Sequence, residues 1–385
     1  MTMQINVKAT LLILLIDLSI VITPTAQSLN SNQEVEKGQI LVVNGIVELK
    51  RRGESNPNGK SSYSRVSIGT PFSRGDLLKV EPSATATVLC AGGSKHELKS
   101  GVHGLPCKAT GNSRTLNIDG FTVIVRPTRS GETNPNVPII LSPRRTKLLN
   151  PRPALRWIPG ARPANYIVNV YEANPDGSKL EGSKFDWSLN SKLKNQCPYP
   201  NDPDKQLTPG ATYMLTVKAG SYSSDEESIP RLVFTLLSTQ ETQVVRDLHQ
   251  RIADLGLPKI AADLLTAQLF AKFGLNAEAI ELLQELSAEV NEPVIAQLLG
   301  DLYATIHLNQ LAMESYLKAL NSAEDKQDKL SVVRAQTSLG QISEALGKKA
   351  QAIEYWRRAK ENCQLLEETE MVQEIDKTLK RLQEQ

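Results

Sequence analysis

Four side chains that could bind a metal or react lie close together between residues 90 and 107. Two cysteines and two histidines, Cys90, His96, His103 and Cys107, fall within eighteen residues, and two thiolates with two imidazoles could bind zinc tetrahedrally. Zinc ligands usually pair at two to four residues apart, whereas five, six and three residues separate these four. In an exported protein, a Cys90–Cys107 disulfide is the simpler interpretation, and free thiols or a metal site are the alternatives.

Motifs for catalysis are not evident elsewhere. The four histidines are scattered, and none adjoins a glycine-x-serine-x-glycine nucleophile elbow. Gly92-Gly93-Ser94 lacks the lysine-serine end and the following helix of a phosphate-binding loop. Carboxylate runs such as Asp225-Glu226-Glu227 are typical of solvated surfaces. We therefore expect no catalytic residue, cofactor or metal, and an envelope-modifying hydrolase or metal-dependent enzyme is the alternative.

Residues 1–26 have the pattern of an export signal. Lys8 supplies an early positive charge, residues 11–22 are almost wholly apolar, and Pro24–Gln27 offers a small-residue cleavage point. The apolar run is shorter than the roughly 20 residues that span a bilayer. Asp17 lies within the run and weakens its insertion. A retained membrane anchor is the alternative to a cleaved signal. We expect a periplasmic or secreted protein with no membrane span after cleavage.

Composition indicates an ordinary globular chain of two or three domains. The chain has 385 residues, 40% of them hydrophobic, and a net charge of +2. Four cysteines are too few to build a disulfide scaffold, and Cys197 and Cys363 are expected to be unpaired.

Short β-branched runs alternate with turn signals over residues 38–126, which predicts an all-β domain of tight hairpins. The runs are Ile40–Val43, Ile46–Leu49, Ala86–Leu89 and Phe121–Val125. Gly38–Arg52, Ile68–Leu78 and Ala84–Ala86 resemble the FecR-type periplasmic domain, in which a strand pair precedes a glycine-aspartate turn followed by apolar residues.

A proline-marked linker at 127–143 leads to a second β domain at 144–237. Within Leu207–Tyr213, a leucine, a proline-glycine turn and a tyrosine resemble the tyrosine corner of fibronectin type III or immunoglobulin-like sandwiches. That resemblance implies a sandwich with Trp157 in its core.

A basic tract surrounds the linker and is opposed within its span only by Glu132. One interpretation is charge on edge strands, which prevents pairing between sheets. The other is contact with peptidoglycan or an anionic polysaccharide. Nucleic acid is not expected, because aromatic residues are sparse there. The tract comprises Arg126, Arg129, Arg144, Arg145, Lys147, Arg152, Arg156 and Arg162.

Small and bulky residues recur over the last third of the chain, at 240–385. The pattern Gly300, Tyr303, Ala312, Tyr316 also occurs 33 residues earlier and 40 residues later. Such a period predicts stacked helical hairpins, with the small residues where paired helices cross. The longer second interval predicts an extra polar turn at 321–329, and a last helix at 369–382 is expected to cap the stack.

Residues 257–366 resemble tetratricopeptide (TPR) repeats, although the usual leading tryptophan is missing. An unrelated amphipathic bundle is the alternative. The resemblance implies a concave groove lined by the first helix of each hairpin, which would bind an extended peptide or protein partner. Alternatively, the groove positions only face water. The positions are Leu264, Gln268, Ala271, Gln297, Asp301, Ala304, Arg334, Thr337, Gln341 and Glu344.

The whole order of segments resembles exported envelope proteins common in cyanobacteria. The expected fold class is multidomain α and β: a FecR-like β domain, a β-sandwich and an all-α TPR solenoid. The expected function is that of a non-catalytic exported scaffold or adaptor.

Overall fold

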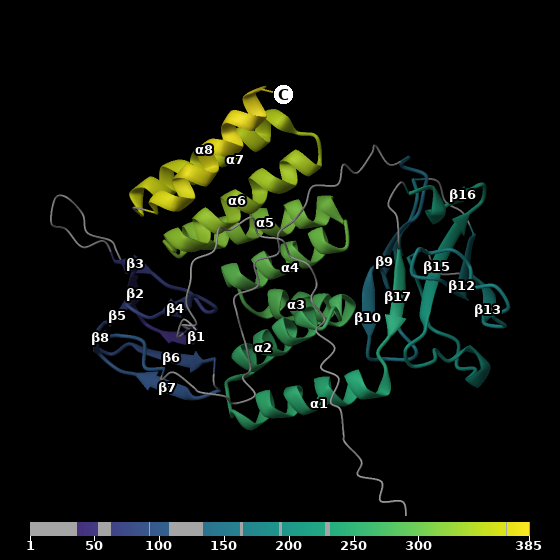
Figure 1. The fold of residues 1–385 in the computed structure, drawn as a ribbon, viewed down its shortest axis with the longest axis horizontal. Coiled ribbons are helices and arrows are strands. Elements are labelled where there is room, and N and C mark those ends of the chain that lie inside the picture. The colour runs from purple at the N-terminus through teal and green to yellow at the C-terminus, as the bar shows by residue number, and fades with distance from the viewer. Residues whose placement is uncertain are drawn as a thin grey trace, which may run out of the picture. The chain divides into compact units, whose positions relative to one another are not determined.

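The computed structural model describes residues 37–52, 63–91, 93–107, 134–161, 165–191, 195–227, 232–366 and 368–384 (Figure 1). The export signal expected at 1–26, the strand expected at 121–125 and the first part of the linker expected at 127–143 lie outside these ranges. Residues 35–385 group into a single unit. Strands precede a run of helices in the chain, which confirms the expected fold class.

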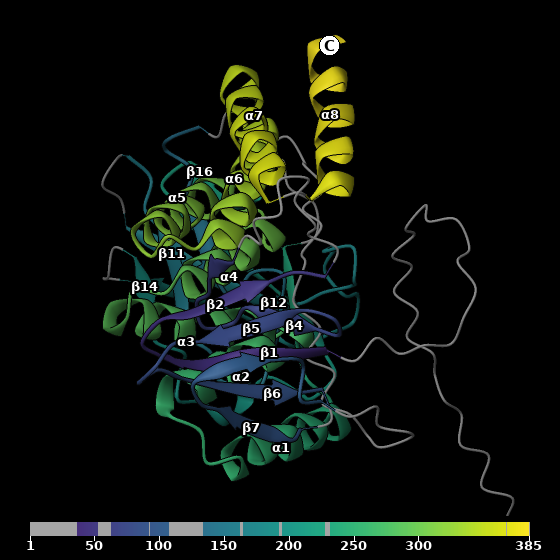
Figure 2. The same ribbon diagram turned by 90° about the vertical axis from the view of Figure 1, so that its left-hand side faces the viewer.

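The first β module consists of two four-stranded sheets, ordered β4-β1-β6-β7 and β3-β2-β5-β8 (Figure 1 and Figure 2). Alternation along β2 buries Val47 and Leu49 and turns Glu48 and Lys50 outward, as expected for strands with one face on a core. Its strands are β1 Lys37–Asn44, β2 Val47–Lys50, β3 Ser64–Arg65, β4 Pro71–Ser73, β5 Leu77–Val80, β6 Thr85–Cys90, β7 Lys95–Leu98 and β8 Gly101–His103.

The glycine-aspartate turn of this module is held by a buried carboxylate. Asp76 is 3% exposed and accepts hydrogen bonds from the Arg51 guanidinium at 2.7 Å and from the backbone N–H groups of Arg52 and Ser73 at 3.0 Å. Gly75 has a φ of +94°, which a side chain would strain. The turn therefore joins β4 and β5 to the end of β2.

The second β module is a sandwich of a three-stranded sheet, β14-β11-β9, and a six-stranded sheet, β10-β17-β15-β12-β13 with β16 on β15. Its core contains Trp157, which is 1% exposed. The Tyr213 hydroxyl accepts a hydrogen bond from the Thr208 backbone N–H at 2.8 Å, which confirms the predicted tyrosine corner. The strands are β9 Ile139–Ser142, β10 Thr146–Leu148, β11 Leu155–Ile158, β12 Tyr166–Glu172, β13 Asp186–Ser191, β14 Gln196–Cys197, β15 Thr212–Ala219, β16 Tyr222–Ser223 and β17 Val233–Leu236.

The helices form successive antiparallel hairpins, α2/α3, α4/α5 and α6/α7, with α1 before them and α8 after them. Gly300 on α4 lies against the ring of Tyr316 on α5, and Gly340 on α6 lies against Trp356 on α7. The predicted glycines are therefore at helix contacts. The helices are α1 Thr239–Asp254, α2 Lys259–Lys272, α3 Asn276–Glu289, α4 Pro293–Thr305, α5 Asn309–Asp325, α6 Lys329–Ala345, α7 Lys349–Leu365 and α8 Thr369–Glu384.

The longer second interval has a different cause from the extra polar turn that was expected. Helices α5, α6 and α7 are each 17 residues long, whereas α2 and α3 have 14 and α4 has 13. Ser322 and Ala323 are 1% and 0% exposed, and the Ser322 hydroxyl donates to the Asn291 carbonyl at 3.1 Å. These residues have buried partners, so the chain continues as helix: α5 is three residues longer than α3, and α6 has four more residues before Gly340 than α4 has before Gly300.

Helix α8 covers the last hairpin with an amphipathic face. Ile375, Leu379 and Leu382 are buried with Trp356 and Cys363 of α7, and the rest of α8 is largely exposed. Among the described residues, no helix combines the length and the apolar character needed to cross a membrane.

Candidate functional site

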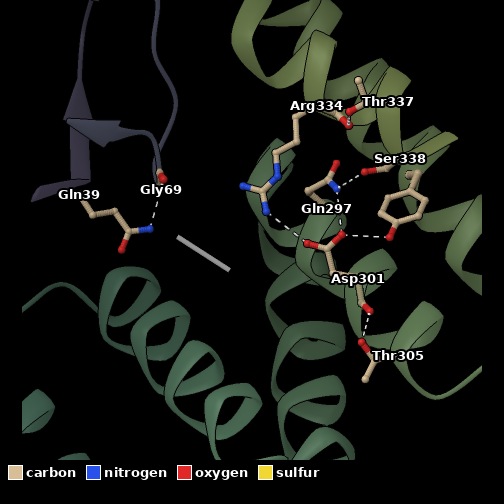
Figure 3. A network of polar contacts seen from close by, with 9 residues as sticks. Gln39, Gly69, Gln297, Asp301, Thr305, Arg334, Thr337 and Ser338 are labelled. Atoms are coloured by element: carbon tan, nitrogen blue, oxygen red, sulfur yellow. Dashed lines mark hydrogen bonds and ion pairs between the residues drawn. The ribbon is translucent and has the colours of Figure 1, made fainter. Parts of the chain in front are cut away.

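A buried polar cluster connects the first helices of the second and third hairpins (Figure 3). Gln297 and Asp301 lie one turn apart on α4, and the Gln297 amide donates to Asp301 Oδ1 at 3.0 Å and to Ser338 Oγ at 2.9 Å. The Tyr316 hydroxyl donates to Asp301 Oδ1 at 3.0 Å, and Arg334 donates to Asp301 Oδ2 at 3.2 Å. We call these five residues the Asp301 cluster.

The electrostatics of the cluster depend on the burial of Asp301. Its side chain is 5% exposed, whereas that of Arg334 is 41% exposed. Burial raises the pKa of Asp301, and the Arg334 charge and the hydrogen bonds from Tyr316 and Gln297 oppose this shift. Burial and the neighbouring Asp301 raise the pKa of Tyr316 well above its ordinary value, so Tyr316 remains a hydrogen-bond donor. Arg334 is thus held from its buried side while part of it faces solvent.

Other predicted groove positions have packing or intrachain roles. Leu264 is fully buried in the helical core. Gln268 is half-buried, and its carbonyl oxygen has no hydrogen-bond partner in the described part of the chain. Thr337 donates to the Arg334 carbonyl at 2.8 Å. Gln341 is half-buried.

Glu344 extends the same face toward the end of the stack. Both of its carboxylate oxygens accept from Arg381 of α8, at 2.6 and 2.8 Å. Ala271 and Ala304 are buried, at 7% and 3% exposed. Of the predicted groove residues, Gln297, Asp301 and Arg334 are therefore brought together, while Glu344 is bound to the capping helix.

Three members of this arrangement were not among the predicted groove residues. The repeat pattern predicts only a packing role for Tyr316, yet its hydroxyl reaches Asp301. Ser338 follows Arg334 by four residues, and this helical spacing was a signal that could have identified it. Arg381 lies on a helix expected only to cap the stack, and no local pattern indicates its pairing with Glu344.

The first β module covers part of the first helices. Leu41 and Leu89 of that module share a buried apolar cluster with Leu265 and Leu269 of α2. A Cβ on Gly69 would lie 2.6 Å from a methyl carbon of Val294, at the start of α4. The chain's own β module therefore occupies the α2 side of this face and also reaches the start of α6, where Leu330 packs against its core. The partly exposed side chains of Arg334, Gln341 and Glu344 lie further along α6.

The basic tract is largely engaged within the chain. Arg144 is 1% exposed and donates to both oxygens of Glu227, at 3.2 and 2.9 Å. Its Nε also donates to the carbonyl of Ile306, at the end of α4, at 2.8 Å. Arg144 thus joins the segment after the linker to the sandwich and to the helices.

Further cations of the tract also have partners, and three of its arginines lie outside the described residues. Lys147 pairs with Glu241 at 2.7 Å and Arg156 with Glu281 at 2.9 Å, and Arg152 donates to Asn201. Two of these pairs connect the sandwich to the helices. This pairing favours a structural role for these cations.

The cysteine–histidine group is resolved into separate contacts. Cys90 and Cys107 form a disulfide, so neither thiolate is available to a metal. His96 hydrogen-bonds to Ser94 Oγ, and His103 to the Lys99 carbonyl. Cys197 and Cys363 are free and buried. Within the described ranges, no group of three or more histidines, cysteines or carboxylates is arranged to hold a metal ion.

The stacked hairpins define a TPR-like helical repeat structure, here combined with two β modules. No family model and no curated protein matches the chain. Among solved structures, it is similar to MamA, with 18% identity over 38% of this chain and 90% of that chain, at a TM-score of 0.27. It is also similar to the TPR-like repeats of a Podosopora anserina kinesin light chain, with 14% identity over 37% of this chain and 89% of that chain, at a TM-score of 0.28. Likenesses at this level carry no argument about function.

Proposed function

We propose that this protein is a non-catalytic scaffold that binds a protein or an extended peptide on the α6 side of its helical hairpins. The observation that carries the proposal is the Asp301–Arg334 pair, in which a buried carboxylate orients a guanidinium that is 41% exposed. A guanidinium held in this way binds carboxylates and carbonyl groups with little loss of side-chain freedom. Its partner would therefore offer acidic or amide groups.

Gln341 adds a polar contact to this surface. It follows Arg334 by seven residues, so the two side chains lie two turns apart on one face of α6. An extended peptide along α6 would contact both. Because the first β module covers the α2 side, we expect the partner to engage fewer hairpins than a fully open repeat groove would offer.

The test is proximity labelling in the native host with a matched pair of variants. Asp301→Asn/Arg334→Gln removes one acid and one base; Asn has the size of Asp, and Gln keeps an amide donor on a shorter side chain. Glu314→Gln/Lys318→Gln makes the same charge change at exposed positions on α5. We expect the first variant to lose partners that the wild type and the second variant retain. Equal recovery by all three, with unchanged melting temperatures, would refute the proposal.

We propose further that the protein is exported and acts in the periplasm or outside the cell. The predicted signal at 1–26 and the Cys90–Cys107 disulfide support this, because disulfides persist in oxidising compartments. Cell fractionation, with peptide mapping of the non-reduced protein, tests it. A cytoplasmic protein with four alkylatable thiols would contradict it. The described cations of the basic tract are engaged within the chain, so we do not extend the proposal to peptidoglycan or anionic polysaccharide.

A further inference from the structure

A cavity of about 320 Å³ lies between the first β module and the helices, separate from the Asp301 cluster. The β module contributes the β1–β2 hairpin, Val43 and Gly45–Val47, and the segment Arg65–Ile68. The helices contribute Glu292, before α4, and Asp325–Lys326, at the end of α5. Its size is at the lower end of the range for small-ligand sites.

Two residues that line the cavity each carry a buried polar atom without a hydrogen-bond partner in the described part of the chain. Ser67 is 5% exposed, and its hydroxyl is unpaired. One carboxylate oxygen of Glu292 accepts from the Lys326 ammonium at 2.9 Å, while the other is buried and unpaired. Leaving such groups unsatisfied is costly. Both can accept a hydrogen bond, and one is anionic, so the group they best complement is an ammonium.

The remaining wall is aliphatic. Val47 and Val66 are buried, Val43 and Ile68 are partly buried, and Ile46 is 44% exposed although it lines the cavity. A ligand with an aliphatic side chain would cover apolar surface here, including part of Ile46, and burial of such surface is favourable.

Opposite charges balance around the cavity. Arg65 and Asp325 are exposed, and Lys326 and Glu292 are half-buried and paired with each other. Two cations and two carboxylates favour a ligand with no net charge. Arg65 is a suitable partner for a carboxylate, because a guanidinium can bind both of its oxygens.

The geometry points to a binding site for a zwitterion with an aliphatic side chain, either a free α-amino acid or a dipeptide. The ligand ammonium is bound by Glu292 and Ser67, its carboxylate by Arg65, and its side chain by the valine and isoleucine wall. This site does not depend on the proposed docking face on α6.

Calorimetric titration of the full chain with four probes tests the assignment. L-leucine has both charges, leucinamide lacks the carboxylate and N-acetyl-leucine lacks the ammonium. Leu-Gly places the carboxylate one residue further on. We expect L-leucine or Leu-Gly to bind at least tenfold more tightly than either single-charge analogue. The tighter binder of the two shows whether the ligand is a free amino acid or a dipeptide. No binding, or equal affinity for all four probes, would overturn the assignment.

Variants of the lining residues link each charge to its partner. Glu292→Gln should weaken L-leucine and leucinamide but leave N-acetyl-leucine unchanged. Arg65→Gln should weaken L-leucine and N-acetyl-leucine but leave leucinamide unchanged. Ser67→Ala should act in the same direction as Glu292→Gln. If all these variants bound L-leucine as the wild type does, the site would be elsewhere.

Two control variants make the same charge changes outside the cavity. Lys99→Gln matches Arg65→Gln, and Glu285→Gln matches Glu292→Gln; both positions are exposed and neither lines the cavity. The affinity for L-leucine should be unchanged in both controls. Thermal melts of every variant check the fold, so that a loss of binding can be separated from unfolding.

Discussion

Gly300 and Tyr316 are in such close contact that a Cβ at residue 300 would lie 2.4 Å from the tyrosine ring. Tyr316 is 1% exposed, and its hydroxyl is bound to Asp301, the residue after Gly300. The ring therefore has neither space nor freedom to move away. This contact links the crossing of α4 and α5 to the Asp301 cluster.

Substitution of Gly300 by alanine is therefore expected to destabilise the protein. Alanine stabilises a helix by about 1 kcal/mol relative to glycine. Overpacking a buried contact typically costs about 1–3 kcal/mol, and we expect a cost near the upper end of this range because the Tyr316 ring is held in place. We expect a net loss of about 1–2 kcal/mol, measured by urea denaturation. Gly340→Ala, against Trp356 at 2.8 Å, should show the same sign. A rise in stability for Gly300→Ala would contradict the close contact.

The buried pair Arg144–Glu227 should be sensitive to the loss of one partner. Glu227→Gln leaves the Arg144 charge without a compensating charge, which typically costs about 3–5 kcal/mol when a buried pair is broken. The double variant Arg144→Met/Glu227→Gln removes both charges and should recover part of this loss. Chemical denaturation of the wild type, the two single variants Glu227→Gln and Arg144→Met, and the double variant gives the coupling energy. A loss in the double variant equal to the sum of the two single losses would show that the pair is not coupled.

The carboxyl of Glu278 should make stability depend on pH. One of its oxygens accepts from the Leu149 N–H at 2.7 Å, and the other is buried without a partner in the described residues. Burial raises the pKa of Glu278 from 4.5 to about 7. Between these pH values the folded state holds a proton that the unfolded state has lost, so its contribution to stability falls as pH rises from about 4.5 to 7.

Glu278→Gln removes this dependence while preserving the acceptor for Leu149. The free energy of unfolding of the variant, measured relative to wild type at the same pH, should rise by up to about 3 kcal/mol between pH 4.5 and pH 8. Each pKa unit corresponds to about 1.4 kcal/mol. Denaturation at several pH values measures the difference. Exposed Glu285→Gln, on the same helix, is the control. A constant difference between Glu278→Gln and wild type would contradict the shifted pKa.

Removal of the Cys90–Cys107 disulfide should destabilise the first β module. The bond closes a loop with a sequence separation of 17, and a loop of about this length is worth about 3 kcal/mol in the chain-entropy account. Cys90→Ala/Cys107→Ala should lower the free energy of unfolding by about 2–4 kcal/mol. Cys197→Ala provides a comparison in which no crosslink is lost. If reducing agent left the wild-type transition unchanged, the crosslink would contribute no stability.

Local patterns were sufficient to predict the features that depend on neighbours along the chain. The recurrence of small and bulky residues predicted the helix contacts of Gly300 and Gly340, and the spacing from Leu207 to Tyr213 predicted the tyrosine corner. These predictions succeeded because a helical hairpin or a β corner is formed within a few tens of residues. Side-chain size and backbone preference act there directly.

Only the tertiary structure decided which charged residues are surface groups and which are not. The sequence places Arg144 in a basic tract that is expected at the surface, yet it is buried with Glu227, 83 residues away. The repeat pattern places Asp301 in an open groove, yet it is enclosed by Tyr316 and Arg334. The reason is physical: the burial of a charge is tolerated only when a distant part of the chain brings a partner to it, and periodicity along the sequence does not report which part that is.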